Sequence, residues 1–356
     1  MKKRKAIFCI VMILCFSLLV SCASKGNGKG DGAGTGKAKV SDYFPFTENI
    51  HMVYKGEGNE YASYETYVEY IKDNIMQTRV INPGTTSVVV YEIKNGELKR
   101  ILNRGETYHR YDYTSVKRDE EIILKEPIKE GTSWTLKDGS KKTITAVDKS
   151  ISTPLGNYTA LEVTTESQNS TITEYYVKNI GLVKSIFKLK GDKMTDDNYT
   201  VTSTLEKIEE NASLKENAKF YFPDYNSGQL AYVNRKIEFR TNQTVEEVIE
   251  KAMKELPKNS SLSSVLSDNT KILSIRLDDN KDLVTVDFSS HLLTEMNAGT
   301  SLESMILQSI ANTIGEYFQK QNVKITVEGK PYSSGHILME ENEYFTVNTE
   351  GCYEYK

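Results

Sequence analysis

Oxygen-bearing side chains alternate along Asp278–Asp282, a spacing that could hold a calcium ion. Calcium loops of the EF-hand type begin in this way, with ligands at the first, third and fifth positions. They also need a glycine at the sixth position and a bidentate glutamate at the twelfth. This chain has Leu283 and Ser289 at those two positions. We therefore predict a solvated hairpin turn here and no metal site.

The four histidines are isolated in the sequence, and none of them completes an HExxH motif, a Cys/His cluster or a GxSxG elbow. They are His51, His109, His291 and His336. Asp287 stands between Val286 and Phe288, so strand alternation places it on the opposite, polar face, where it could cap a turn. The sequence predicts no catalytic residue and no cofactor, and hence a protein that is not an enzyme.

Residues 22–40 are rich in glycine and lysine and contain almost nothing to bury. Gly34-Thr35-Gly36-Lys37 has part of the pattern of a phosphate-binding loop. However, Asp31 occupies the place of the first glycine, and Ala38 occupies that of the hydroxyl residue that would bind Mg²⁺. We predict that this segment is a flexible tether.

Cys22 is the residue for which the sequence predicts a chemical modification. Residues 1–21 combine a cationic start with an apolar run, Ala6–Val20, that is short for a membrane span, which is typical of an export signal. The junction Leu19-Val20-Ser21-Cys22 resembles the lipobox of bacterial lipoproteins. That resemblance implies removal of residues 1–21, diacylation of Cys22, and a protein anchored by lipid on the extracytoplasmic face of the cell membrane.

The charge of the chain argues against a nucleic-acid partner. Removal of the signal, with its four positive side chains, takes the formal charge from −4 to −8. Binding to phosphates needs a basic surface. Cys9 and Cys15 would leave with the signal and Cys22 would carry lipid, so Cys352 has no partner for an intramolecular disulfide and is expected to be free.

Residues 41–211 show short alternating segments separated by turn signals, which predict an antiparallel all-β domain. The strongest hairpin signals are Asn95-Gly96 and Asp138-Gly139, each between two alternating runs. Four tyrosines recur every third residue: Tyr61, Tyr64, Tyr67 and Tyr70. They could form a stacking surface for sugar rings or line a site for an apolar ligand. They could equally pack on a pleated sheet without binding anything.

The C-terminal region reads as strands and helices in the order β-β-α-β-β-α-β. Thr244 and Glu247 predict a capping box, as do Thr300 and Glu303, each at the start of an amphipathic helix. In the second helix we expect Ile310 to face the core and Gln308 to face solvent. Residues 212–219 read as a polar connecting segment, or joint, before this domain. Residues 339–356 read as a C-terminal tail.

Residues 220–338 resemble the GerMN domain of sporulation and spore-germination proteins. The resemblance rests on Tyr221-Phe222-Pro223-Asp224, Arg235-Lys236-Ile237, Val286-Asp287-Phe288-Ser289 and Val327-Glu328-Gly329-Lys330-Pro331. It implies a noncatalytic module of cell-envelope assemblies with a two-layer α/β fold. The region around Asp42-Tyr43-Phe44-Pro45 resembles the N-terminal β region of envelope lipoproteins from clostridia-like Gram-positive bacteria.

We therefore expect an α+β multidomain lipoprotein that acts as a binding or assembly module in the cell envelope, linked to sporulation or spore germination. Its partners would be the membrane, through the N-terminal lipid, and an envelope protein or a peptidoglycan-associated protein. The alternative is that the N-terminal β domain carries a lipid or another apolar ligand. The sequence does not determine the oligomeric state.

Overall fold

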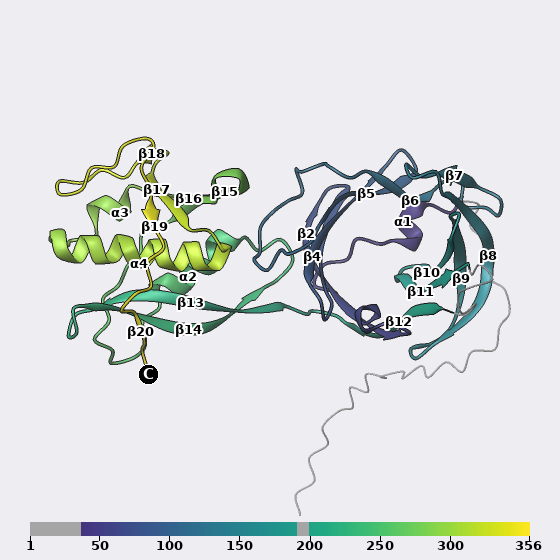
Figure 1. Cartoon of the computed structure of the whole chain (residues 1–356), viewed down its shortest axis with the longest axis horizontal. Coiled ribbons are helices and arrows are strands. Elements are labelled where there is room, and N and C mark those ends of the chain that lie inside the picture. The colour runs from purple at the N-terminus through teal and green to yellow at the C-terminus, as the bar shows by residue number, and fades with distance from the viewer. Residues whose placement is uncertain (1–36, 191–198) are drawn as a thin grey trace, which may run out of the picture. The chain divides into compact units, whose positions relative to one another are not determined.

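The computed structural model describes residues 37–190 and 199–356, and strands dominate both ranges (Figure 1). The expected signal 1–21, most of the tether 22–40 and Cys22 therefore lie outside the described residues. The first part of the described chain contains twelve strands. They are β1 His51–Glu57, β2 Tyr64–Lys72, β3 Ile75–Ile81, β4 Thr86–Lys94, β5 Glu97–Arg104, β6 Glu121–Lys125, β7 Ser133–Thr135, β8 Lys141–Thr153, β9 Gly156–Glu166, β10 Ser170–Val177, β11 Gly181–Leu189 and β12 Thr200–Glu209.

These twelve strands form one antiparallel sheet, so the expected antiparallel β structure is confirmed. The order is β6-β5-β4-β3-β2-β1-β12-β11-β10-β9-β8-β7, and the sheet curls round on itself (Figure 1). We call it the coiled sheet. Asn95-Gly96 turns β4 into β5 with both residues at positive φ, and Gly139 does the same between β7 and β8. Both hairpin predictions are therefore correct.

The two ends of the coiled sheet meet through a side chain. β6 and β7 do not pair with each other among the described strands. Instead the indole nitrogen of Trp134 on β7 donates a hydrogen bond of 3.0 Å to the carbonyl oxygen of Ile122 on β6. A buried indole N–H needs such a partner.

Helix α1, Val40–Tyr43, lies inside the coiled sheet (Figure 1). Val40 and Tyr43 are buried in one apolar cluster with Leu98 and Trp134. The backbone is held at two points, because Val40 N donates to the Glu126 carboxylate and Asn179 N donates to the carbonyl of Asp42. The expected tether 22–40 is therefore wrong at its end, because Val40 is buried and begins the helix that closes part of the interior of the sheet. A short 3₁₀ turn, η1 Glu60–Ala62, follows β1.

The C-terminal part has two sheets and a layer of helices. Its elements are β13 Leu214–Asp224, β14 Gln229–Phe239, α2 Val245–Lys254, β15 Ile272–Asp278, η2 Asp279–Lys281, β16 Leu283–Phe288, α3 His291–Thr294, α4 Thr300–Phe318, β17 Asn322–Val327, β18 Lys330–Pro331, β19 Phe345–Thr346 and β20 Tyr353–Glu354. One sheet has the order β13-β14-β20. The other has the order β15-β16-β17-β18, with β19 paired to β17.

Helix α4 lies between these two sheets, which differs from the expected two-layer arrangement (Figure 1). The reason is that α4 is buried on more than one side, at polar positions such as Ser309, Asn312 and Thr313 as well as at apolar ones. Besides the expected Ile306, Ile310 and Ile314, it also buries Leu307 and Phe318. A helix that buries residues on more than one side must be covered on each of those sides. The chain also adds α3 and β18 to the expected order of elements, and the strands build two sheets.

One capping prediction is correct and the other is wrong. Thr244 caps α2, and the capping box with Glu247 is present. At α4 the N-cap is Gly299, and no side chain caps the helix. Glu303 is instead buried and used elsewhere, as described below. Gln308 was expected to face solvent, but it is half-buried and donates hydrogen bonds to Asn312 and to the Thr346 carbonyl.

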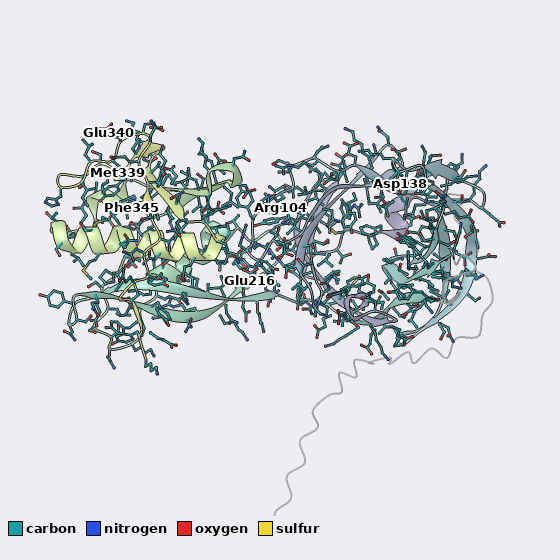
Figure 2. All side chains as sticks on the ribbon, in the orientation of Figure 1. Arg104, Asp138, Glu216, Met339, Glu340 and Phe345 are labelled. Carbon is teal, nitrogen blue, oxygen red and sulfur yellow. The ribbon has the colours of Figure 1, made fainter. Side chains whose placement is uncertain are left out.

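Two segments that looked like connections are parts of the sheets. Most of the expected joint 212–219 belongs to β13, which pairs with β14 over its whole length. Residues 339–356, expected to be a tail, supply β19 and β20, which pair with β17 and β14. Met339 and Phe345 of this segment pack against the core (Figure 2). The physical reason is that these strands bring apolar side chains, among them Phe345 and Tyr353, against the core.

Candidate functional site: a cavity inside the coiled sheet

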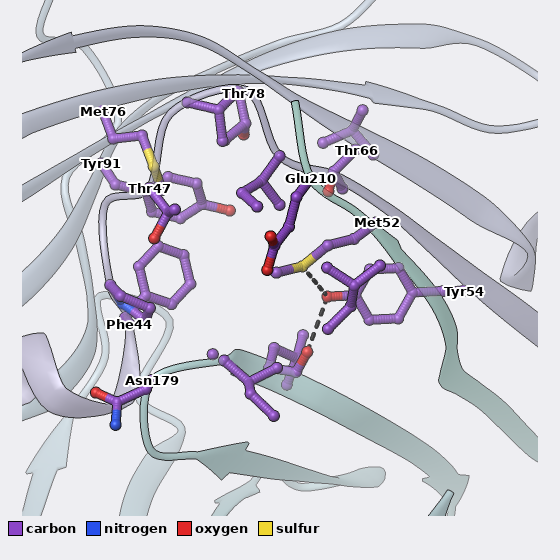
Figure 3. A pocket seen from close by; sticks show the side chains of 18 of the residues that line it. Phe44, Thr47, Met52, Tyr54, Thr66, Met76, Thr78, Tyr91, Asn179 and Glu210 are labelled. Atoms are coloured by element: carbon purple, nitrogen blue, oxygen red, sulfur yellow. Dashed lines mark hydrogen bonds between the residues drawn. The ribbon is translucent and has the colours of Figure 1, made fainter. Parts of the chain in front are cut away.

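A cavity of about 460 Å³ opens inside the coiled sheet (Figure 3). Its volume lies within the ~300–1,000 Å³ range typical of small-molecule sites. Most lining side chains are apolar or aromatic. The lining comprises Phe44, Pro45, Thr47, Ile50, Met52, Tyr54, Tyr64, Thr66, Val68, Met76, Thr78, Val80, Tyr91, Asn179, Ile180, Gly181, Leu182, Ile208 and Glu210.

Strand alternation explains how the neighbouring strands supply this lining. Every second side chain of a strand points to the same face. Strand β2 contributes Tyr64, Thr66 and Val68 in this way. The register with β1 and β3 places Met52 and Val80 opposite Thr66 on either side. The wall of the cavity is therefore continuous across three strands.

The remaining walls come from irregular segments. Phe44 follows α1, and its ring lies 4.8 Å from that of Tyr91, centroid to centroid. The turn between β10 and β11 adds residues 179–182 on another side. The hydroxyl of Tyr54 donates to the carbonyl of Leu182 at 2.8 Å, which fixes this turn against β1. Residues far apart in sequence thus enclose one space.

The polar groups of the lining are mostly uncharged hydroxyls of threonine and tyrosine. The hydroxyl of Tyr91 points into it (Figure 3) and has no hydrogen-bond partner among the described residues. Burial raises the pKa of Tyr91 to about 12, so this group is a neutral donor at ordinary pH. Burial also raises the pKa of Tyr54. Glu210 is the one side chain of the lining that carries a formal charge.

The four regularly spaced tyrosines have four different environments. Tyr64 lines the cavity and stacks on Tyr54 with centroids 4.3 Å apart. Tyr67 faces the other side of the sheet and stacks on His51, and Tyr70 is buried under Arg110. Tyr61 is exposed. They form no common stacking surface, so the expectation of an apolar lining holds for Tyr64 alone.

Sequence reasoning missed most of the cavity residues, including Met52, Met76, Tyr91 and Glu210. The available signal was the alternation in Tyr64-x-Thr66-x-Val68 and Met76-x-Thr78-x-Val80. Alternation identifies a face but does not tell whether that face is packed or hollow. The walls from Phe44 and residues 179–182 carry no such signal at all.

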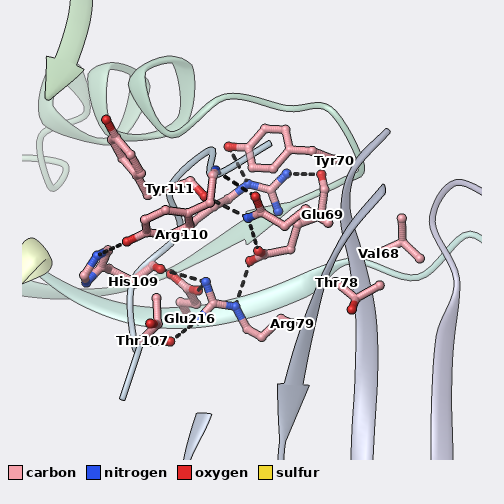
Figure 4. Close-up of polar contacts among 12 residues, drawn as sticks. Val68, Glu69, Tyr70, Thr78, Arg79, Thr107, His109, Arg110, Tyr111 and Glu216 are labelled. Atoms are coloured by element: carbon pink, nitrogen blue, oxygen red, sulfur yellow. Dashed lines mark hydrogen bonds and ion pairs between the residues drawn. The ribbon is translucent and has the colours of Figure 1, made fainter. Parts of the chain in front are cut away.

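A second buried cluster lies on the outer side of β2 and β3, where the coiled sheet meets β13 and α4 (Figure 4). Arg79 forms a buried ion pair with Glu69 and donates to the carbonyls of Thr107 and His109. Glu216 of β13 lies near Arg79 and accepts a hydrogen bond of 2.7 Å from Tyr317 of α4. Burial raises the pKa of Glu216. We call this group the polar joint.

Arg110 belongs to the same polar joint and is completely buried. Its guanidinium donates to the backbone carbonyls of Glu69, Arg240 and Gln243. It also lies over the ring of Phe239. These contacts satisfy the donors of a charge that is removed from water, which is the condition for burying it. The arrangement holds structure together and presents no open side to a ligand.

Asp278–Asp282 form a turn whose carboxylates are already engaged. Asp279 forms ion pairs with Arg104 and Lys320. These contacts, chiefly the hydrogen bond from Arg104, lower the pKa of Asp279 to about 2. Asp287 accepts hydrogen bonds from Thr326 and from the backbone of Gly329, so it caps the turn after β17. Asp287 and Thr326 are buried, and this part of the expected polar sheet face is therefore not free.

The histidines are also engaged separately. His51 contacts Glu65 and Glu209, and His336 contacts Glu303. Burial, helped by nearby Arg79, Arg104 and Lys320, lowers the pKa of His109 to about 3, although Asp279 opposes this. His291 is exposed. In the ranges 37–190 and 199–356, no three His, Cys, Asp or Glu side chains are placed to hold a metal ion.

Glu303 is the most deeply buried carboxylate among the described residues of the C-terminal region. It accepts hydrogen bonds from Tyr332, Ser334 and His336. Burial opposes ionisation, but the bonds from Ser334, His336 and Tyr332 outweigh it and lower the pKa of Glu303. The cluster ties the segment after β18 to the start of α4. Cys352 is free and half-buried. No helix of the described ranges has both the length and the apolarity to cross a membrane.

Comparisons with solved structures return distant similarities. The tandem GerMN domains of the sporulation protein GerM from Bacillus subtilis are 20% identical, with 38% of this chain and 46% of that chain covered and a TM-score of 0.30. This chain thus spans less than half of that structure. A candidate lipoprotein from Clostridium perfringens is 17% identical over 38% of this chain and 87% of its own, with a TM-score of 0.25.

A candidate exported protein of Bacteroides fragilis with a YmcC-like fold is 12% identical over 47% of this chain and 99% of its own, with a TM-score of 0.30. No curated protein matches the chain. A family model does match the C-terminal part, in agreement with the resemblance seen in the sequence. Residues 219–333 match the Germane family, described as sporulation and spore germination.

Proposed function

We propose that this protein is an extracytoplasmic lipoprotein that acts as a noncatalytic binding and assembly module in the cell envelope during sporulation or spore germination. The observation that carries the proposal is the match of residues 219–333 to the Germane family. The export signal and Cys22 support the location. The partner is an envelope protein or a peptidoglycan-associated protein, and the membrane is reached through the lipid.

The chemistry of the C-terminal region supports a binding role over a catalytic one. Its buried carboxylates, Asp224, Asp287 and Glu303, all accept hydrogen bonds from the protein itself. Catalytic acids and bases must reach a substrate. The buried carboxylates of the C-terminal region instead connect its elements through hydrogen bonds, which suits a module that presents a stable surface.

Deletion and complementation in the source bacterium test this proposal. Loss of the gene should lower the yield of heat-resistant spores or their germination. The wild-type gene should restore it, and Cys22→Ala should restore it poorly, because its product is not retained at the membrane. Photo-crosslinking in intact sporulating cells should then capture an envelope partner through residues 219–333. Normal sporulation and germination of the deletion strain would contradict the proposal.

A second candidate function is favoured by one specific observation, the cavity in the coiled sheet. A space of about 460 Å³ lined mainly by apolar side chains is suited to carry a lipid or another apolar ligand. Mass spectrometry of organic extracts from the purified protein tests this function. A stoichiometric apolar compound is the expected result, and an extract without one after purification in the absence of detergent would count against carriage.

A further inference from the structure

We propose that the cavity binds a single-chain amphiphile whose head group is uncharged or cationic, and that it excludes anionic head groups. The proposal rests on the second candidate function, carriage of an apolar ligand, and specifies the class of that ligand. The apolar chain would lie against the inner face of β1, β2 and β3, and the head group would lie at Glu210.

The walls of the cavity suit one flexible chain. Met52 and Met76 contribute unbranched side chains that adapt to the shape of what they contact. The rings of Tyr54 and Tyr64 stack on each other and form a flat apolar wall. Burial of each methylene of a chain contributes about 0.8 kcal/mol. For a chain that fills the cavity, the free energy of methylene burial favours binding without any charge contact.

The polar side chains of the lining are threonines, tyrosines, Asn179 and one carboxylate, that of Glu210. Glu210 follows the end of β12 and is exposed, and its carboxylate turns toward the cavity beside Met52 (Figure 3). No ion pair among the described residues includes Glu210. The hydroxyl of Tyr91 is a second free group, able to donate or accept a hydrogen bond. An alcohol, an amide or an amine can form a hydrogen bond with either group.

Electrostatics decides the sign of the head group. The lining contains no lysine, arginine or histidine, so nothing in it neutralises a carboxylate or a phosphate. An anionic head would instead meet the carboxylate of Glu210, and like charges at short range repel each other. A cationic head meets an opposite charge, and a neutral head meets a hydrogen-bond acceptor.

Three probes with the same chain separate these cases: dodecylamine, 1-dodecanol and dodecanoate. Each is titrated, below its aggregation concentration and at pH 7.5, into the chain from residue 23 to 356, which includes every described residue, with calorimetric readout. We expect binding of the amine and the alcohol at one per chain and at least tenfold weaker binding of dodecanoate. Glu210→Gln should bring dodecanoate close to the alcohol. Glu206→Gln, which removes the same charge at an exposed position of β12, should change none of the three affinities.

A blocking variant tests the place of binding. Val68→Phe fills the cavity, whereas Val53→Phe adds the same ring on the opposite face of the sheet. Val68→Phe should abolish binding, and Val53→Phe should leave it intact, with circular dichroism to show that both variants fold. If dodecanoate binds as tightly as the amine, the head-group proposal is refuted while carriage stands. If no probe binds, or if Val68→Phe binds as well as Val53→Phe, carriage in this cavity is refuted too.

The Glu210→Gln comparison keeps the test decisive even if Val68→Phe fails to fold, because that substitution alters no packed side chain. Unequal affinities for dodecylamine and dodecanoate that remain unchanged in Glu210→Gln would show that Glu210 does not select the head group. That outcome would overturn the assignment of the residue.

Discussion

Arg79 and Glu69 form an ion pair that is almost completely removed from solvent. Arg79 Nε donates to Glu69 Oε1 at 2.7 Å, and the two side chains are 2% and 0% exposed. They come from adjacent strands, β3 and β2, on the outer side of the coiled sheet. Gln77 also donates to Glu69 at 2.7 Å, so the carboxylate is held by two partners. This pair is the centre of the polar joint.

Removal of Arg79 should destabilise the protein severely. Arg79→Ala leaves Glu69 buried without its main counter-charge, which typically costs about 3–5 kcal/mol. Urea denaturation at pH 7, followed by circular dichroism, measures the change. Arg118→Ala is the matched control, because Arg118 is exposed, and it should change the free energy of unfolding by less than about 0.5 kcal/mol. Similar small effects of the two substitutions would show that the pair is not desolvated in solution.

Ile310 should be a major contributor to the stability of the C-terminal region. It is completely buried in α4, between the two sheets. Ile310→Ala should cost about 2–5 kcal/mol through lost burial and the cavity left behind. Ser301→Ala is the control, since Ser301 is exposed on the same helix and should have an effect below about 0.5 kcal/mol. Equal, mild effects on the chemical denaturation midpoint would contradict the observed packing of α4.

Acidification should destabilise the protein through His109. Its folded-state pKa of about 3 lies below the ordinary value of 6.5, so below pH 6.5 the unfolded state binds a proton that the folded state does not. The associated stability is complete above pH 6.5 and falls as the pH drops from 6.5 toward 3, by up to about 1.4 kcal/mol per pH unit. Unfolding free energies at pH 7 and pH 5 measure this loss.

His109→Gln should flatten that pH dependence, whereas His291→Gln should leave it as in the wild type, because His291 is exposed. If both variants show the wild-type slope, His109 is not the titrating group.

Cys22 should be the site of lipid attachment, because only its thiol can take the diacylglycerol. Cys22→Ala should therefore abolish incorporation of radiolabelled fatty acid in growing cells and leave the signal uncleaved at that site. Cys352→Ala should retain full labelling and normal processing. Persistence of the label in Cys22→Ala would refute the lipid anchor.

Local patterns predicted the elements well and their assembly less well. The hairpins at Asn95-Gly96 and Asp138-Gly139 and the cap at Thr244 depend on a few adjacent residues, and all three are present. Thr300 and Glu303 have the same local pattern, but Glu303 finds Tyr332, Ser334 and His336 as partners. Contacts with residues about thirty positions away in the chain therefore determined that the Glu303 side chain does not form a capping box.

The polar joint also shows where sequence reasoning stops. Residues 212–219 look polar, and the sequence alone therefore predicts an exposed connection between two regions. Glu216 of this segment is buried beside Arg79 and Tyr317, residues that lie in other elements. Charged residues read as surface residues unless their partners are known. Only the folded chain brings these partners together.

The sequence by itself determined the antiparallel β structure of residues 41–211, the helices at Val245 and Thr300 and the resemblance to the GerMN domain. These follow from periodicity and turn chemistry, which act between residues close in the chain. The tertiary structure alone decided that the strands curl around an open space and that Tyr91 and Glu210 face it. Whether a sheet face is packed or hollow depends on how distant segments, here Phe44 and residues 179–182, fill the volume above it, and no local pattern encodes that volume.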